Sequence, residues 1–306
     1  MRDSTAVGHA TILVVVVLYR SSLTAAQTLQ GLATAFAANP SLLRGMEVLV
    51  WDNGPEAIAD PQLPFPFTYV HAEHNQGVAG AYNGASARAR KRGHIWMLLL
   101  DQDTCITEEF LLRCQEYGSD LAGSQEIAAI VPFLYAGTFQ LSPRRLTMFS
   151  QPPIPAGKSY IERRKMFAAN SGTMVRVDAL KQIGGYSLDF WLDHSDRYVF
   201  HQFHRQGFSV FVAADLRLQH ELAMLDYDRR MTPERYRNFL DAEAAFDALY
   251  NGWPQRTVQT LRLPIRALRQ RRYQNKVYRR MTMQAFWRRV LKSRKRWLDT
   301  WLEGRA

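Results

Sequence analysis

Apolar runs alternate with helical patterns over the first two-thirds of the chain. Residues 11–19 and 96–100 form runs typical of strands buried in a parallel sheet, and residues 46–51, in which Glu47 is the one charged residue, predict a further strand. Between them lie two segments with a helical pattern. The first is rich in Ala and Leu and can be capped by Ser21 or Ser22, and the second runs from about residue 77 to 92. This alternation predicts an α/β protein with a doubly wound, mostly parallel sheet.

The later part of the chain has a less regular pattern. Residues 127–134 form a further apolar run, whereas residues 135–165 carry four prolines and no clear period, which predicts an irregular insertion. Two short apolar segments, Ser209–Ala213 and Leu216–Gln219, predict strand pieces. Helical patterns fill the chain beyond them.

Acidic residues stand where two of the predicted strands end. Asp52 closes the second strand, and Asp101 and Asp103 follow the third with one residue between them. Because α/β proteins bind ligands at the carboxyl ends of parallel strands, these carboxylates are expected at one sheet edge. There they can hold a hard divalent cation, and the cation can neutralise a diphosphate. The pattern favours an enzyme with a nucleotide-activated substrate over a merely solvated turn.

Composition excludes several classes of protein. The 306 residues include only two cysteines, too few for a disulfide framework or a zinc site, so a reducing compartment is expected. The apolar run that begins at Thr11 is too short to span a bilayer and lacks the layout of a signal peptide. A cytoplasmic protein without a transmembrane helix is therefore predicted.

The net charge of +11 is concentrated at the carboxyl end. Residues 255–306 contain sixteen Lys or Arg and two Asp or Glu, a net charge of +14, while the remaining 23 and 26 leave −3. Apolar residues recur there at helical spacing, namely Met283, Phe286, Trp287, Val290, Leu291, Trp297, Leu298, Trp301 and Leu302. A basic amphipathic helix suits an anionic membrane surface. The alternatives are packing on the core or a homodimer contact, and the lack of a recognised motif disfavours nucleic acid.

An ordered set of short motifs between about Thr11 and Glu221 resembles inverting family 2 glycosyltransferases, which have the GT-A fold. The motifs are Trp51-Asp52-Asn53-Gly54, the block Asn75–Asn83, Leu99–Thr104, Asn170–Thr173, Ile183–Tyr186, Leu192–Asp196 and Leu218–His220. In particular, the sequences LLLDQDT and NQGVAGAYN are similar to those of bacterial rhamnosyltransferases that build O-antigen and related surface polysaccharides. The chain departs from the family pattern at Arg20, where Asn is frequent, and at Tyr198, where Glu is frequent.

This resemblance implies a reaction and a set of partners. A sugar, L-rhamnose from dTDP-L-rhamnose, would move onto a hydroxyl of a glycan or polyprenyl-diphosphate-linked acceptor in a single displacement assisted by Mg²⁺ or Mn²⁺. The matching residues that would bind the nucleotide and donor are Tyr19, Asp52, Asn75, Gly77, Asn83, Asp101, Gln102 and Asp103. Those that would hold the metal are Asp103, Asp101 and His220.

For Asp52 and Asp196, a purely structural role is an alternative that stays open. Asp52 would accept a hydrogen bond from the pyrimidine base, but Asp52-Asn53-Gly54 also has the composition of an Asx turn. Asp196 would be the general base that takes the proton of the acceptor hydroxyl, with Asp193 as the second candidate. Asp196 could instead cap the helix that follows it.

The chain is expected to divide near residue 225. Residues 1–225 would form the GT-A catalytic domain, with a nucleotide-binding half at about 1–105 and an acceptor half at about 106–225. Residues 226–306 would form a basic helical extension that associates with the membrane, which places the protein on the cytoplasmic face of the cell membrane. The competing hypothesis is a catalytically inactive GT-A-like scaffold that binds membrane or nucleic acid through the basic tail.

Overall fold

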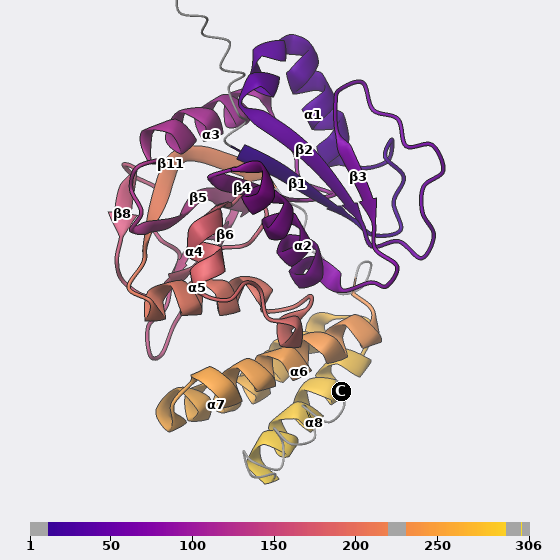
Figure 1. Ribbon diagram of the computed structural model, residues 1–306. Helices are drawn as coiled ribbons and strands as arrows, with labels where there is room; N and C mark the ends of the chain where they lie inside the picture. The colour runs from indigo at the N-terminus through magenta and orange to yellow at the C-terminus, as the bar shows by residue number, and fades with distance from the viewer. Residues whose placement is uncertain (1–11, 220–230, 292–300, 302–306) are drawn as a thin grey trace, which may run out of the picture. The chain divides into compact units, whose positions relative to one another are not determined.

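The computed structural model describes residues 12–219, 231–291 and 301 and shows two compact units (Figure 1). The first contains the described residues up to Leu146, then Pro152–Trp191, and those from Ser195 to residue 219. The second contains Thr147–Gln151, Leu192–His194 and the described residues from 231 onward. Thr147–Gln151 and Leu192–His194, although they come earlier in the sequence, therefore belong to the same unit as the carboxyl-terminal helices. None of the helices in the described part of the chain has the length and apolarity of a membrane span.

A mixed, mostly parallel sheet forms the centre of the first unit, in the order β3-β2-β1-β4-β10-β5-β11-β8, with β6 beside β5. Four strands pair in parallel, namely β1 (Ile12–Leu18), β2 (Met46–Asp52), β3 (Thr68–His71) and β4 (Trp96–Asp101). Of these, β2 ends at the predicted acid Asp52 and β4 at Asp101. The others are β5 (Ile127–Ala136), β6 (Phe139–Ser142), β8 (Tyr160–Glu162), β10 (Met174–Arg176) and β11 (Ser209–Gln219). Among these, β11 is parallel to β5, whereas β6, β8 and β10 pair antiparallel with their neighbours. The α/β fold class predicted from the sequence is confirmed.

Helices cover both faces of this sheet (Figure 1). Those on one face are α1 (Gln27–Ala38) and α3 (Glu108–Asp120), and those on the other are α2 (Gly77–Arg92), α4 (Val177–Gln182) and α5 (Ser195–Arg205). Successive β1 side chains enter the two cores alternately, and all seven are buried. Double-sided burial explains why this strand is an uninterrupted apolar run, since a polar residue on either face would lose its hydration.

The predicted serine cap of the first helix was wrong. Helix α1 begins only at Gln27, and its N-cap, Ala26, makes no side-chain capping bond. The Ser22 hydroxyl instead accepts a hydrogen bond from the Ala25 N–H (3.1 Å) in the preceding turn. The Thr28 N–H donates to the Gln102 carbonyl (3.2 Å), so a long-range contact occupies one of the first N–H groups of the helix.

The region predicted as an irregular insertion contains short strands, so that prediction was wrong in part. It forms β6, β7 (Arg144–Arg145) and β8, and β7 pairs with β9 (Met166–Phe167). These strands are too short to show a hydrophobic period, and Pro143 interrupts the run between β6 and β7. The two predicted strand pieces after Ser209 are one strand, β11, with a register shift between Val212 and Arg217. This irregularity accounts for the apparent break in the sequence pattern.

The second unit is built mainly from α6 (Pro233–Tyr250), α7 (Trp253–Arg269) and α8 (Val277–Leu291). Its small core consists of Met231, Tyr236, Leu240, Leu263 and Tyr278. The described residues also form short 3-10 helices, namely η1 (Pro40–Arg44), η2 (Leu188–Phe190) and η4 (Gln270–Arg272). Within the core the Tyr236 hydroxyl accepts from the Gln270 amide (2.8 Å), so these two buried polar groups satisfy each other.

An ion-pair network joins the three helices of this unit. Glu243 on α6 is 7% exposed and lies 2.6 Å from Arg266 of α7 and 3.4 Å from Arg289 of α8. Burial by itself would raise the pKa of Glu243, but the two guanidinium groups outweigh it and lower that pKa to about 2. Arg289 also pairs with Asp247 (2.7 Å). These carboxylates depend on both later helices for their compensating charge.

Candidate active site

The acids predicted at strand ends lie on either side of β1. In the parallel register Leu18 is opposite Asp52 of β2, and Val17 is opposite Asp101 of β4. Because both neighbours of β1 end at the same level, Asp52, Asp101 and the exit of β1 at Tyr19 meet at one sheet edge. This edge is the carboxyl end of the parallel strands, where α/β enzymes bind ligands.

A single buried threonine holds the turn that carries Asp101 and Asp103. The Thr28 hydroxyl donates to the Asp101 carbonyl (2.5 Å) and accepts from the Thr104 N–H (2.9 Å). Ser171 adds a hydrogen bond to the Thr104 side chain (2.5 Å). The backbone of the turn is therefore fixed by side chains from α1 and the loop before β10, while the carboxylates of Asp101 and Asp103 stay partly exposed. A fixed backbone with accessible carboxylates suits a preorganised ligand site.

Gln102 has a structural contact in addition to its expected role at the donor. Its side-chain oxygen accepts from the Tyr19 N–H (2.9 Å), which joins the turn to the end of β1. The Tyr19 ring is 45% exposed, and the Arg20 guanidinium lies 5.2 Å from its centroid. Arg20 has a φ of 52°, so the chain turns sharply as it leaves the strand.

Asp52 forms the Asx turn that the sequence left open. Its Oδ1 accepts from the Gly54 N–H (2.7 Å), its Oδ2 accepts from the Tyr69 hydroxyl (2.6 Å), and the residue is only 2% exposed. Burial raises the pKa of Tyr69, and the bond to Asp52 raises it further. A carboxylate has about four lone-pair sites, so these two bonds leave acceptor capacity for a ligand. The Asx turn is compatible with the predicted base contact.

Asn75 and Gly77 shape the start of α2. The Asn75 side-chain oxygen accepts from the Gly77 N–H (2.8 Å), and Gly77 has a φ of 63°. The Asn53 amide donates to the Gly77 carbonyl (3.1 Å), and the Trp191 carbonyl accepts from the Ala79 N–H (3.0 Å). The loop is therefore packed between the end of β2 and the segment before α5.

We expect replacement of Gly77 by alanine to destabilise the first unit by roughly 2–5 kcal/mol. A Cβ there would lie 2.2 Å from the Trp191 carbonyl oxygen, and the left-handed backbone adds strain. Gly93 ends the same helix with a φ of 77° and nothing within 4 Å of its Cβ position, so Gly93→Ala should cost only about 1–2 kcal/mol. Urea unfolding of both variants measures the difference, and equal midpoints would contradict the close packing at Gly77.

Asn83 begins a hydrogen-bonded chain that runs from α2 to α5. Its amide donates to the Tyr186 carbonyl and accepts from the Tyr186 N–H, both at 2.8 Å. The Tyr186 hydroxyl donates to Asn170 (3.0 Å), whose amide donates to the Ser195 hydroxyl (3.0 Å). Ser195 immediately precedes Asp196. The expected donor-binding residue Asn83 is thus also part of the scaffold that fixes the start of α5.

Asp196 lies in the first turn of α5, where its Oδ1 accepts from the Arg197 N–H (2.7 Å). Burial raises the pKa of Asp196 above its ordinary value, against the lowering effect of the Arg197 N–H and guanidinium. A carboxylate with a raised pKa is a stronger base than an exposed aspartate, as general-base chemistry near neutral pH requires. Its environment is therefore suited to the predicted role.

Tyr82 connects the two acidic groups of the site. It is fully buried, its ring centroid lies 5.1 Å from that of Tyr186, and among the described residues its hydroxyl has no hydrogen-bond partner. Burial raises the pKa of Tyr82 well above its usual value, and the charges of Asp101, Tyr186 and Asp196 add to the rise. The charges of Asp101 and Asp196, which come from different parts of the sequence, thus both act on this buried side chain.

Asp193, the second base candidate, belongs to the second unit, where it pairs with Arg235 of α6 (3.0 Å). This ion pair gives Asp193 a structural role that Asp196 lacks. His220, the third expected metal ligand, lies outside the described residues. In the part of the chain that the structure describes, no three His, Cys, Asp or Glu residues are grouped as a metal site. The site thus offers the two carboxylates of Asp101 and Asp103.

Sequence reasoning missed several residues that hold the site together. Thr28, Tyr69, Ser171 and Tyr186 each bond to a predicted site residue or to the turn that carries one. Thr28 stands in an Ala-rich helix without any local signal. The segment around Tyr186 was part of a motif, but its pairing with Asn83 spans 103 positions and has no period to reveal it.

The sequence matches a known protein family, and the fold is similar to that of solved structures. The model of glycosyl transferase family 2 matches residues 13–184, more than half of the chain. No curated protein sequence matches. The crystal structure of GalNAc-T7 with UDP, GalNAc and Mn²⁺ is 11% identical with a TM-score of 0.53, over 81% of this chain and 54% of that one. Residues 1–349 of S. aureus TarS align at 14% identity with a TM-score of 0.48, over 83% of this chain and 79% of that one. This chain thus spans about half the length of the GalNAc-T7 chain.

Proposed function

The chain belongs to glycosyl transferase family 2, and from this membership we propose that it transfers L-rhamnose from dTDP-L-rhamnose to a hydroxyl of a lipid-linked or surface glycan. The observation that carries the proposal is the fixed turn with Asp101 and Asp103 at the sheet edge, together with Asp196 near the same buried Tyr82. In this proposal Asp101 and Asp103 would serve the donor diphosphate, and Asp196 would serve the acceptor hydroxyl.

The donor would bind across the ends of β1, β2 and β4. Asp52 would accept a hydrogen bond from the thymine N3–H, and the exposed Tyr19 ring would contact the nucleotide. Asn75 and Gly77 would shape the pocket wall next to Asp52, since Asn53 joins this loop to β2 (3.1 Å). The buried position of Asp52 supports this assignment, because exclusion of water strengthens a hydrogen bond to a base.

A divalent cation fits the residues that the structure describes. Mg²⁺ is usually held by one or two carboxylates and by substrate phosphates, so Asp101 and Asp103 form an adequate protein share. Mn²⁺ has the same preference for oxygen ligands, and GalNAc-T7 was crystallised with Mn²⁺ and UDP. When bound, the cation would neutralise charge on the departing nucleoside diphosphate.

The acceptor reaction would be a single in-line displacement. Asp196 would accept the proton of the acceptor hydroxyl as that oxygen attacks the anomeric carbon, while the bond from this carbon to the diphosphate oxygen breaks. The chain from Asn83 through Tyr186 and Asn170 to Ser195 would hold the start of α5, and with it Asp196, during this step. Inversion of the anomeric centre follows from attack opposite the leaving group.

The protein would work at the cytoplasmic membrane surface, where polyprenyl-diphosphate-linked acceptors are found. The basic carboxyl-terminal helices support this placement, since residues 255–306 carry a net charge of +14. A catalytically inactive scaffold would have no need for the fixed turn around Asp101 and Asp103.

We expect a donor screen to show turnover of dTDP-L-rhamnose and little turnover of UDP-hexoses. This expectation rests on the similarity of the LLLDQDT and NQGVAG segments to rhamnosyltransferases. Slow donor hydrolysis, followed by release of nucleoside diphosphate with Mg²⁺ or Mn²⁺, measures it without a known acceptor. Turnover of a UDP-hexose but not of dTDP-L-rhamnose would reject the donor, and binding of no nucleotide would favour the scaffold.

A further inference from the structure

Exposed apolar side chains are concentrated on the second unit. Of twelve large apolar residues that are strongly exposed in the described chain, nine belong to this unit. Four of them, Trp253, Leu261, Ile265 and Leu268, lie on α7 with exposed fractions of 54–77%. Their spacing of three, four or eight residues places them along one side of the helix. Leu263 and Ala267 of the same helix are buried, so α7 has one apolar side in the core and another in solvent.

Helix α8 and the loop Thr147–Gln151, which belongs to the same unit, extend this surface. Trp287, Val290 and Leu291 on α8 are 52–77% exposed. The Arg262 guanidinium on α7 donates a hydrogen bond to the Phe149 carbonyl, and Phe149 is itself 65% exposed. Isolated apolar residues on a surface are ordinary, but a concentration of them on one unit, with Trp253, Leu261 and Val290 around one pocket, marks a binding surface. We call these residues of α7, α8 and the 147–151 loop the apolar face.

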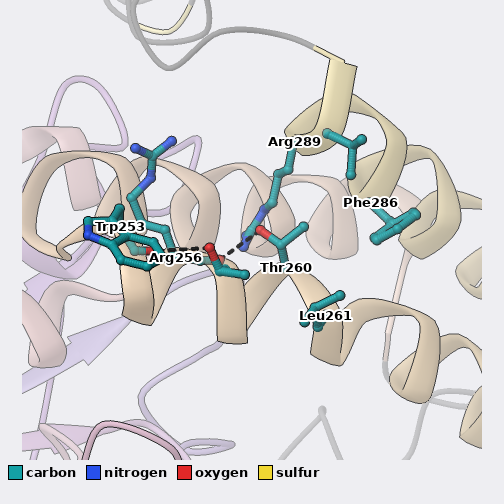
Figure 2. Close-up of a pocket in the computed structure, with 8 residues that line it drawn as sticks. Trp253, Arg256, Thr260, Leu261, Phe286 and Arg289 are labelled. Atoms are coloured by element: carbon teal, nitrogen blue, oxygen red, sulfur yellow. Dashed lines mark hydrogen bonds between the residues drawn. The ribbon is translucent and has the colours of Figure 1, made fainter.

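A pocket of about 350 Å³ opens between α7 and α8 (Figure 2). Trp253 and Leu261 line it from α7, and Phe286 and Val290 line it from α8. Two of the polar residues of its wall have partners within the protein, since the Thr260 hydroxyl donates to the Arg256 carbonyl (2.8 Å) and Arg289 pairs with Asp247 (2.7 Å). The pocket thus presents mainly carbon, which suits an acyl chain better than a polar ligand.

Positive charge accompanies the apolar face. Residues 253–291 contain eleven Lys or Arg and no Asp or Glu. Three of the eleven pair with carboxylates on α6, namely Arg266, Arg288 and Arg289. Residues 231–291 as a whole carry thirteen Lys or Arg and four Asp or Glu, which leaves a net charge of +9 on the described helices of this unit. The partner of this surface must therefore be both apolar and anionic.

These properties select one partner among the obvious ones. A twofold interface with a second copy would bring the same cationic helices together, at a cost in repulsion. Nucleic acid would satisfy the arginines but would give Leu261, Ile265 and Leu268 no apolar contact. An anionic bilayer supplies acyl chains for the apolar residues, headgroups for the tryptophans and negative charge for the arginines.

We propose that the apolar face of α7, α8 and the 147–151 loop docks on an anionic lipid bilayer, with the pocket between Trp253 and Val290 taking the end of an acyl chain. The docking is a property of the second unit, and it rests on the proposed function only where it concerns delivery of a lipid-linked acceptor. It places the principal contact on α7. The tail tryptophan Trp297, which the sequence pattern also suggested, lies outside the described residues.

Vesicle flotation with the full-length protein tests the proposal. Binding is expected with phosphatidylcholine vesicles that contain phosphatidylglycerol, to be weak without it, and to fall as salt rises. The variant Leu261→Glu with Ile265→Glu should lose roughly tenfold or more of the binding, because two inserted side chains become charged. Leu188→Glu alters a leucine of similar exposure in the first unit and serves as the matched control. Thermal unfolding checks that all three proteins are folded.

Other outcomes would overturn the proposal in distinguishable ways. Unchanged vesicle binding in the double variant would move the contact elsewhere. A concentration-dependent dimer in sedimentation, abolished by the double variant in the absence of lipid binding, would assign the face to a second copy. Tighter binding to a DNA oligonucleotide than to vesicles would assign it to nucleic acid. None of these measurements uses a sugar donor. Rejection of the docking proposal would therefore not reject the proposed transfer reaction, which the donor screen tests separately.

Discussion

Replacement of Asp196 by asparagine is expected to lower the rate of transfer by roughly 10²-fold or more while donor binding is retained. The change preserves the size of the side chain and its ability to accept the Arg197 N–H, which lies 2.7 Å from Oδ1. It removes the negative charge that would take the proton of the acceptor hydroxyl. A side chain that only capped α5 would tolerate the substitution.

The measurement compares initial rates with the affinity for nucleoside diphosphate, so that a catalytic defect is separated from a binding defect. Asp193→Asn is the matched control, because Asp193 pairs with Arg235 (3.0 Å) in the second unit. It should affect thermal stability more than the rate. Near-normal turnover in Asp196→Asn, with a large loss in Asp193→Asn, would transfer the base role to Asp193.

The pH dependence of the same rate gives an independent test of Asp196. Burial raises the pKa of Asp196, so its carboxyl group is expected to take up a proton at a higher pH than an exposed aspartate. Because the base must be ionised to act, activity should fall with acidification through this raised pKa and level off above it. The acidic limb should disappear in the residual activity of Asp196→Asn, and its persistence there would attribute the limb to another group.

The sheet edge was predictable because the features that create it are local in the sequence. Strand β1 is buried on both faces and therefore reads as an unbroken apolar run, and the acids of β2 and β4 directly follow such runs. Parallel pairing then places the strand ends level, as the register of Leu18 with Asp52 shows. The block from Asn75 to Asn83 marked the start of α2 correctly, because the helix begins at Gly77, which has a φ of 63°.

The supports of the site could not be predicted, because they depend on contacts between distant segments. Thr28 reaches the Asp101 turn across 73 positions, and Ser171 reaches Thr104 across 67. Short antiparallel strands such as β8 have too few residues to show a period. The apolar residues from Met283 onward predict one amphipathic helix with a single apolar face. In the structure, Phe286 of α8 packs against the core of the second unit, whereas Val290 is half-exposed. The spacing of apolar residues does not distinguish a face that packs on the core from an adjacent face that is exposed.

Replacement of Asp103 by alanine is expected to abolish metal-dependent donor binding without unfolding the protein. The turn that holds Asp103 is fixed through backbone atoms of Asp101 and Thr104 by Thr28, so loss of the Asp103 carboxylate leaves these bonds in place. The described residues offer the cation two carboxylates at this turn, those of Asp101 and Asp103. The substitution would remove one of these two protein ligands of Mg²⁺ or Mn²⁺.

Calorimetric titration of dTDP, with and without Mn²⁺, measures this effect. The wild-type protein should bind dTDP more tightly with the metal, and Asp103→Ala should bind it equally weakly in both conditions. Asp120→Ala removes an exposed acid at the end of α3 and should behave as wild type, which controls for the change in net charge. If Asp103→Ala kept a normal metal-dependent affinity, the cation would have to be held elsewhere. The acidic turn would then have no direct role at the diphosphate, because without a bound cation its carboxylates would repel that anionic group.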